Sequence, residues 1–263
     1  MNVAIKPPFQ KLIKDKLIAL LIHVGASLPV YIVLLLLVRF VWYPDFYYDI
    51  LVIQPILVTL FLVDVVLGPL LTFVIYKKNK PKLIFDIGVI VLFQLSAFVY
   101  GLSIVYKERP LYMVYTIDRF VVVTANSINT DDLIYPELKK KLPAVVASDL
   151  PESEEERQSL LWSVMEGGSD IEYITRLYRP MEKVKNTLLK NGMPLSELPE
   201  KIINEIETKW PDDINNNLKA YPMIPTKSAD QLLIWNIDEQ RMVGLIKKDP
   251  WIIIEKNMKE SKN

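Results

Sequence analysis

Long apolar stretches, broken by short clusters of charge, dominate the first 109 residues of the chain. The first, Leu17 to Val38, holds 22 residues without Asp, Glu, Lys or Arg. A helix of that length crosses a hydrocarbon core of about 30 Å at a rise of about 1.5 Å per residue. A second stretch runs from about Ile50 to Tyr76 and a third from about Ile87 to Tyr106. The pattern predicts three transmembrane helices, at about 17–38, 50–76 and 87–106.

A cleaved signal peptide is the alternative interpretation of the first stretch. The apolar region of such a peptide covers only about 7–15 residues and ends in a small-x-small cleavage site. Here the apolar run is longer and passes into the bulky Arg39-Phe40-Val41-Trp42. We therefore expect the first stretch to remain in the membrane as a helix.

The charges between the apolar stretches predict how the helices are oriented. The segment before the first stretch and the loop after the second each carry four lysines, at Lys6, Lys11, Lys14 and Lys16 and at Lys77, Lys78, Lys80 and Lys82, whereas the loop between holds only Arg39. Positive charge marks the cytoplasmic side, so the amino terminus is expected inside and everything after Tyr106 outside. The aromatic stretch Trp42–Tyr48 fits a belt at the outer membrane surface.

The remaining 154 residues, 110–263, suffice for one independent core. Tyr112–Thr124 predicts two short strands, or one with a bulge, and Leu232–Asn236 with Met242–Ile246 predicts a hairpin. Trp251–Ile254 is a last apolar run. Helices are predicted at Asp131–Leu142, Ser153–Glu166, Glu182–Lys190 and Pro199–Thr208, the second capped by Ser153 and ended by Gly167-Gly168. We therefore expect a membrane protein in which three transmembrane α-helices (residues 1–109) are followed by an α+β soluble domain (residues 110–263).

Composition excludes most enzyme classes. The chain has no cysteine and a single histidine, so thiol catalysis, thiolate metal sites and serine or cysteine triads lack their essential residues. Phosphate-binding, zinc-protease and nucleophile-elbow motifs are absent from the sequence. Up to Arg109 there are 11 basic and six acidic residues, and beyond it 20 and 25, so the second half offers no basic surface for nucleic acid. We expect no catalytic activity, no cofactor, no metal and no nucleic-acid partner.

Ionisable groups inside the apolar stretches are the strongest candidates for function. Asp64 lies near the middle of the second stretch, where an ionised carboxylate is costly and rarely faces lipid. It contacts a partner or takes part in proton transfer, or it locks its own helix to the neighbouring helices. Gly68 and Pro69 put a notch and a break on nearly the same helix face as Asp64, because residues four apart are neighbours on a helix. This arrangement favours a contact surface. His23 is either a polar interhelical residue or a proton carrier.

Several short motifs resemble those of a known family, and together they extend over nearly the whole chain. They are Trp42-Tyr43-Pro44, Asp64-Val65-Val66-Leu67-Gly68-Pro69-Leu70-Leu71-Thr72, Lys82-Leu83-Ile84-Phe85-Asp86, Tyr100-Gly101-Leu102, Arg109-Pro110, Asp118-Arg119-Phe120 and Lys248-Asp249-Pro250-Trp251. The combination resembles the type IV pilin accessory proteins of the TfpX/TfpZ kind. The likeness is strongest from about residue 40 to residue 120.

This resemblance implies an inner-membrane protein of Gram-negative bacteria with no catalytic activity. Such a protein assists one cognate major type IV pilin as a dedicated chaperone, while the amino-terminal helix of the pilin is held in the membrane. Arg109, Asp118 and Arg119 then join Asp64, Gly68 and Pro69 as candidate partner-binding residues. The alternative from another class is a membrane-anchored sensor or transporter subunit with a periplasmic domain.

Overall fold

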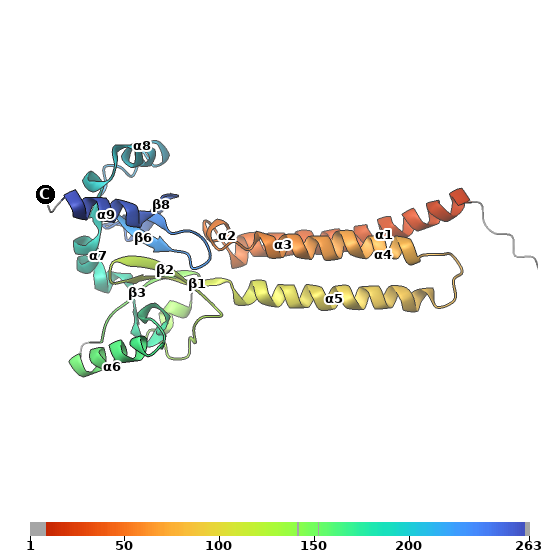
Figure 1. The fold of residues 1–263 in the computed structure, drawn as a ribbon, viewed down its shortest axis with the longest axis horizontal. Coiled ribbons are helices and arrows are strands. Elements are labelled where there is room, and N and C mark those ends of the chain that lie inside the picture. Colours follow the sequence, from red (N-terminus) through yellow and green to blue (C-terminus); the bar gives the residue numbers. More distant parts are fainter. Residues whose placement is uncertain (1–8, 141, 152, 261–263) are drawn as a thin grey trace, which may run out of the picture. The chain divides into compact units, whose positions relative to one another are not determined.

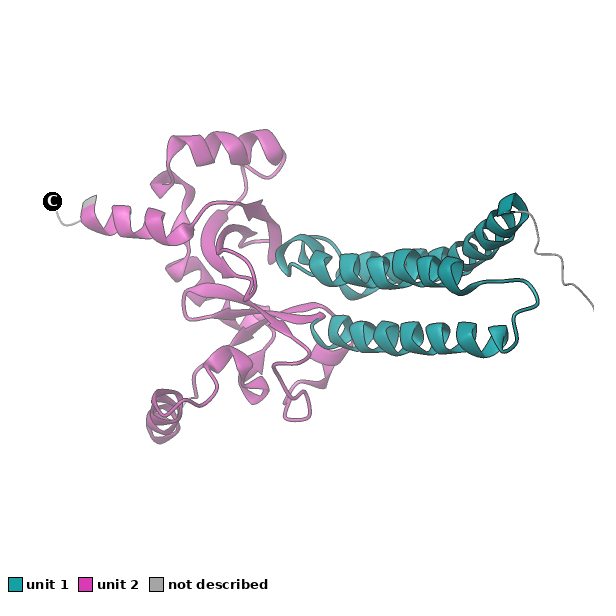
Figure 2. Ribbon diagram, turned by 45° about the vertical axis from the view of Figure 1, so that its right-hand side comes forward, with its two compact units in different colours: residues 1–108 teal, residues 109–263 magenta. Residues whose placement is uncertain are grey.

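The computed structural model describes residues 9–140, 142–151 and 153–260. The chain divides into two compact units, with the boundary between Glu108 and Arg109 (Figure 2). We call residues up to Glu108 the membrane unit and those from Arg109 the sheet unit. Lys6, one of the lysines that predict the orientation, lies outside the described residues.

Three continuous helical runs in the membrane unit are long and apolar enough to cross a membrane: Phe9–Trp42, Gln54–Ile75 and Leu83–Lys107 (Figure 1). They comprise α1 (Phe9–Leu37) with η1 (Val38–Trp42), α3 (Gln54–Phe61) with η2 (Leu62–Leu67) and α4 (Gly68–Ile75), and α5 (Leu83–Lys107). The segments η1 and η2 are π-helical. These runs confirm the three predicted spans.

The second span begins later than the sequence predicts. The short helix α2 (Tyr47–Ile50) ends at the expected start, and Val52 has a φ of 49°, which is outside the right-handed helical region. The next helix begins at Gln54, with Pro55 in its first turn, where the missing N–H of proline is not needed. The tight turn at Val52 thus separates two helices that the apolar pattern joins.

Side chains from α1 and its extension hold the spans together by donating to backbone carbonyls. The Lys16 ammonium donates to the carbonyls of Phe73 and Val74, at 3.0 and 2.7 Å, and so stabilises the carboxyl end of α4. The Tyr31 hydroxyl donates to the carbonyl of Leu57 at 3.0 Å. Tyr43 donates to the carbonyl of Val105 at 2.7 Å, so this aromatic residue of the expected surface belt points into the unit instead.

The sheet unit is built on one mixed sheet. Its strands are β1 (Pro110–Thr116), β2 (Arg119–Thr124), β3 (Ala144–Ser148), β4 (Tyr178–Arg179), β5 (Met193–Pro194), β6 (Leu218–Ile224), β7 (Gln231–Asn236) and β8 (Arg241–Ile246). They lie in the order β4-β3-β1-β2-β6-β7-β8, and β5 also pairs with β6. The pairs β1–β3 and β2–β6 are parallel, and the other pairs are antiparallel.

Short helices join and cover these strands. They are α6 (Glu154–Met165), α7 (Lys185–Asn191), α8 (Glu200–Lys209) and α9 (Pro250–Glu260), with 3₁₀ segments at Pro136–Lys139, Ile171–Tyr173, Thr175–Leu177, Met181–Val184 and Leu195–Glu197. On α8, Ile202 and Ile206 are four residues apart and pack with Leu232 and Ile234 of β7. A second apolar cluster joins β1, β2 and β3 through residues such as Val114. This architecture confirms the expected α+β class.

Local signals predicted several of these elements. Ser153 caps α6, where its Oγ accepts a hydrogen bond from the Glu156 N–H at 3.2 Å, and Gly167 follows the helix with a φ of 91°. The β1–β2 pair shows that the first segment forms two strands, and β7 and β8 form the predicted hairpin.

The predicted helix at Asp131–Leu142 is wrong. Pro136 forces the residue before it away from the helical region, and Tyr135 has φ −107° and ψ 94°. Among the described residues of this range, only Pro136–Lys139 is helical, as a 3₁₀ segment. The apolar run Trp251–Ile254 belongs to the helix α9. Strands β3 to β6 were not among the sequence predictions.

Candidate functional site

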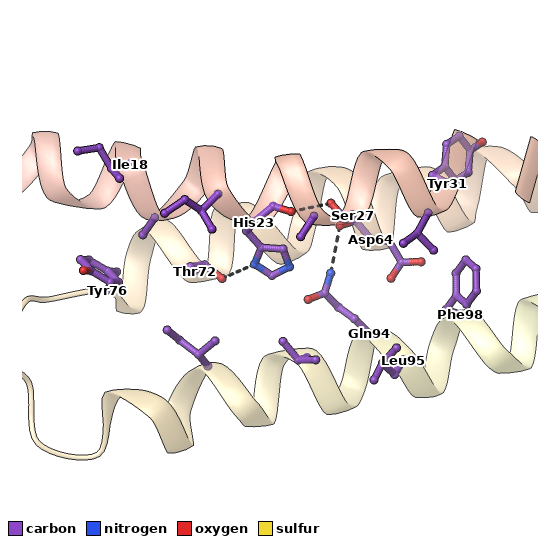
Figure 3. Close-up of a pocket in the computed structure, with 16 residues that line it drawn as sticks. Ile18, His23, Ser27, Tyr31, Asp64, Thr72, Tyr76, Gln94, Leu95 and Phe98 are labelled. Atoms are coloured by element: carbon purple, nitrogen blue, oxygen red, sulfur yellow. Dashed lines mark hydrogen bonds between the residues drawn. The ribbon is translucent and has the colours of Figure 1, made fainter. Parts of the chain in front are cut away.

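A groove of about 500 Å³ runs through the membrane unit between α1 and α5, with η2 and α4 contributing its floor. Most of its lining is aliphatic or aromatic. A few polar side chains interrupt this lining, and Figure 3 shows them near the middle of the groove: His23, Ser27, Asp64, Thr72 and Gln94. A largely apolar groove with a small polar group of this kind is the common form of a binding site.

The polar group begins with a break in the hydrogen bonding of the second span. In the π-helical segment η2, the Gly68 N–H donates to the carbonyl of Val63, five residues back. In the same pattern, the N–H of residue 69 would donate to the carbonyl of Asp64. Residue 69 is proline, which has no N–H. The Asp64 carbonyl therefore needs a donor from outside its own helix.

Gln94 of α5 supplies that donor. Its side-chain Nε2 donates to the Asp64 carbonyl at 3.1 Å (Figure 3). The approach depends on the absence of a side chain at position 68, because a Cβ placed on Gly68 would overlap the Gln94 amide. Gly68 and Pro69 are both buried, and the notch predicted at Gly68 is occupied by Gln94 of the same chain. We call Asp64, Gly68, Pro69 and Gln94 the Asp64–Gln94 cluster.

The cluster leaves one buried oxygen atom, Asp64 Oδ2, without a partner among the described residues. The Gln94 amide oxygen faces the His23 ring, which interacts with the Gln94 side chain (Figure 3). The Asp64 residue is only 8% exposed, and Figure 3 shows its carboxyl group between Gln94 and Phe98 in the groove. Most buried polar groups in proteins are paired, so an unpaired acceptor of this kind calls for an explanation.

His23 links the first two spans next to this cluster. Its Nδ1 lies 2.7 Å from Thr72 Oγ1, and Ser27 Oγ donates to the His23 carbonyl at 3.0 Å (Figure 3). The histidine is therefore a polar interhelical residue, as one of its two sequence interpretations states. It extends the polar part of the groove by one turn of α1.

The other candidates lie in the sheet unit and form a separate cluster. Asp118 follows Ile117 in the turn between β1 and β2, and its Oδ1 accepts from Arg119 Nε at 2.7 Å. The Arg119 guanidinium lies 5.0 Å from the centroid of the Trp251 ring, and Trp251 Nε1 donates to Asp230 Oδ2 at 2.7 Å. Two of the quoted motifs thus meet, and we call these residues the Arg119–Trp251 cluster.

The turn that carries Asp118 is held in an unusual conformation. Ile117 has a φ of 51°, a region that β-branched residues avoid. Its carbonyl accepts from the Tyr115 hydroxyl at 3.0 Å and from Asn191 Nδ2 at 2.7 Å, which fixes the turn. Burial raises the pKa of Tyr115 to about 12, so its hydroxyl remains a donor at neutral pH. Arg109 lies at the other end of the β1–β2 pair, away from this turn. Its carbonyl accepts a hydrogen bond from the Ala125 N–H at 3.0 Å.

The sheet unit has its own groove of about 890 Å³, lined by residues that include Asp118, Met193 and Leu198. Within the described residues, no side chain that lines it is among those with a buried unpaired polar atom. The described part of the chain also contains no group of three His, Asp or Glu residues arranged to hold a metal ion. The membrane groove is therefore the stronger candidate for binding.

Sequence reasoning singled out Asp64, Gly68 and Pro69 as candidates and did not include Gln94. The signal was present, because Gln94 is an amide in a stretch without charge, and polar residues within spans often mediate contacts between helices. Its partner was hidden, since the free carbonyl of Asp64 arises only from the π-helical turn.

Comparison with known proteins shows similarity to fimbrial assembly proteins of Dichelobacter nodosus over 114 residues, or 43% of this chain. The serogroup I protein is 39% identical and the serogroup E1 protein 35% identical, and each match covers 44% of that relative. The protein of serogroups C1 and C2 is 36% identical, with 87% of its length covered. The match thus spans less than half of the serogroup I and E1 proteins. No family model and no solved structure matches the chain.

Proposed function

Because the chain belongs to the family of fimbrial assembly proteins, we propose that it assists one cognate major pilin of a type IV pilus. In this role it acts as a dedicated chaperone of the TfpX/TfpZ kind, before or during assembly of the pilus. The observation that carries the proposal is the similarity to the relative of serogroups C1 and C2, which extends over 87% of that protein.

The architecture suits this task. A subunit that waits in the bilayer before assembly presents an apolar helix within the membrane and a folded head outside it. Helices associate in lipid by close packing and by buried polar contacts. The membrane unit offers a groove with buried polar atoms, and the sheet unit offers a separate folded domain. No step of this role requires catalysis.

The role also requires a particular topology. We place the protein in the inner membrane, with the amino terminus in the cytoplasm and the sheet unit in the periplasm, because the lysines gather before the first span and after the second. A reporter that is active only in the periplasm should be active when fused after Asn263, and a cytoplasmic reporter should be silent there. The reverse pattern would contradict the topology.

Deletion of the gene tests the function directly. Loss of the protein should reduce the amount of cognate pilin in membranes, the amount of surface pili, or both, and the wild-type gene should restore them. Complementation with Asp64→Asn keeps the hydrogen-bonding shape of the side chain but removes any charge. Unchanged pilin and pili after deletion would contradict the proposal and favour a membrane sensor or transporter subunit.

A further inference from the structure

We propose that the groove between α1 and α5 binds a single transmembrane helix of a partner, and that this helix presents a hydrogen-bonding side chain to Asp64. The inference deepens the proposed function and rests on it only in taking the partner to be a membrane protein. The contact lies in one groove, and the helix that fits it carries a side chain that can form a hydrogen bond.

The length of the groove suits a rod that lies along the spans. Its lining extends on α1 from Ile18 to Tyr31, which is about 20 Å at a rise of about 1.5 Å per residue. On α5 it extends from Ile87 to Phe98. Both walls are mainly aliphatic and aromatic, and the second span closes the floor. The groove thus covers much of the thickness of a hydrocarbon core of about 30 Å.

The α1 wall allows close approach of another helix. Ala19, Ala26 and Ser27 line it, and small residues of this kind let helix backbones pack closely in lipid. Ala26 is exposed, so no other side chain of the described residues covers it. By contrast, a Cβ placed on the neighbouring Gly25 would meet no atom within 4 Å, and Gly25 does not line the groove. Of these two adjacent positions, Ala26 therefore lies on the groove side of α1 and Gly25 lies outside the groove.

The unpaired oxygen atom of Asp64 determines which occupant fits. Asp64 Oδ2 is buried without a partner among the described residues, while the Gln94 amide nitrogen donates to the Asp64 carbonyl and the Gln94 oxygen faces His23. Water is scarce at this depth of a bilayer, which favours a donor that comes from protein. A lipid acyl chain offers no donor, and neither does a purely apolar helix. An amide or hydroxyl side chain both donates and accepts, and so it satisfies Asp64 in either protonation state.

A defined peptide tests this assignment without any pilin. The full-length protein is reconstituted in phosphatidylcholine vesicles with a fluorescent 22-residue leucine–alanine transmembrane peptide that carries one asparagine at its centre. The matched peptide carries leucine at that position. Interhelical hydrogen bonds predict about 3- to 30-fold tighter binding of the asparagine peptide, measured by energy transfer to the labelled protein.

Three variants locate the binding. Ala26→Leu fills the groove and should abolish binding of both peptides, whereas Gly25→Leu adds the same side chain on the adjacent outer position and should leave binding unchanged. Asp64→Leu removes the carboxyl acceptor and should reduce the difference between the two peptides. Thermal unfolding of each variant in the same vesicles checks folding, and Ala26→Leu remains informative if Asp64→Leu unfolds.

Equal affinity for the two peptides would overturn the assignment, and so would binding that survives Ala26→Leu. Energy transfer between two labelled copies of this chain that is lost with Ala26→Leu would also overturn it, because the groove would then hold a second copy. None of these results depends on pilin levels in cells, so failure of the inference and failure of the proposed function can be distinguished.

Discussion

In the membrane unit, Asp64 keeps a buried oxygen atom that has no partner among the described residues. In the sheet unit, by contrast, Arg119 contacts both Asp118 and Trp251, and Trp251 donates to Asp230. Both clusters contain residues of the motifs quoted for the resemblance, although Gln94 and Asp230 lie outside those motifs. The Asp64–Gln94 cluster has an unpaired hydrogen-bond acceptor within a groove. The Arg119–Trp251 cluster uses its charged and aromatic groups in contacts inside the sheet unit.

The difference matters because the two clusters lie in different surroundings. A polar group at a wet surface can pair with water, so its contacts say little about a partner. Water is scarce in the hydrocarbon core, so an unpaired acceptor there supports the proposed contact with a partner helix. We therefore propose that a partner binds at the Asp64–Gln94 cluster and that the Arg119–Trp251 cluster stabilises the sheet unit.

The largest effect is expected from Gly68→Leu, because the new side chain overlaps Gln94 of the same chain. The Asp64 carbonyl then loses its donor, and we expect overpacking to cost at least about 1–3 kcal/mol of stability. The level of the protein in membranes, measured by immunoblot, should fall several-fold. Combining Gly68→Leu with Gln94→Ala should restore part of it. An unchanged level with reduced pilin would contradict the internal packing described here and would favour a surface at Gly68.

A smaller effect is expected from Arg119→Ala in the sheet unit. The loss of the contact with Trp251 should lower stability by about 1 kcal/mol, which corresponds to a few degrees in the thermal midpoint of the full-length protein. Arg176→Ala, an exposed arginine of the same unit, is the control and should have no such effect. Loss of pilin or pili at unchanged stability would instead make the Arg119–Trp251 cluster a partner site.

The smallest effect is expected from Glu172→Gln, through the pH dependence of stability. Burial raises the pKa of Glu172, so at pH values between the unfolded and folded pKa the folded chain binds more protons than the unfolded chain. The stability contributed by this proton is present below the unfolded pKa of about 4.3 and is lost as the pH rises through the folded pKa. The thermal midpoint of Glu172→Gln, relative to the wild type, should therefore rise between pH 4 and pH 8. A parallel pair of pH curves would contradict this.

The sequence was sufficient for features that depend on apolar length or on one local signal. The three spans follow from uninterrupted apolar stretches, and helix α6 follows from Ser153 and Gly167. It was insufficient where two remote segments decide the outcome. Strand β3 lies parallel to β1, and the parallel contact of β2 with β6 joins residues about a hundred positions apart, so neither pairing leaves a local pattern.

The candidate site divides in the same way. Asp64 stands out from sequence because a carboxyl group in an apolar span is costly. The role of Gly68 depends on Gln94, which approaches from the next span, and on Pro69, which frees the carbonyl that Gln94 binds. The sequence also joined Ile50 to the second span because Leu51, Val52 and Ile53 are apolar, although the turn at Val52 separates them.

Disulfide crosslinking in cells tests most directly whether the partner binds in the membrane groove. The chain has no cysteine, so a single cysteine placed at Ala26, Gly25 or Asp118 reports on one position at a time against a pilin with one cysteine in its membrane helix. We predict a crosslinked product of protein and pilin from Ala26→Cys that is much weaker from Gly25→Cys and absent from Asp118→Cys. A product that forms from Asp118→Cys but not from Ala26→Cys would contradict the assignment of binding to the groove.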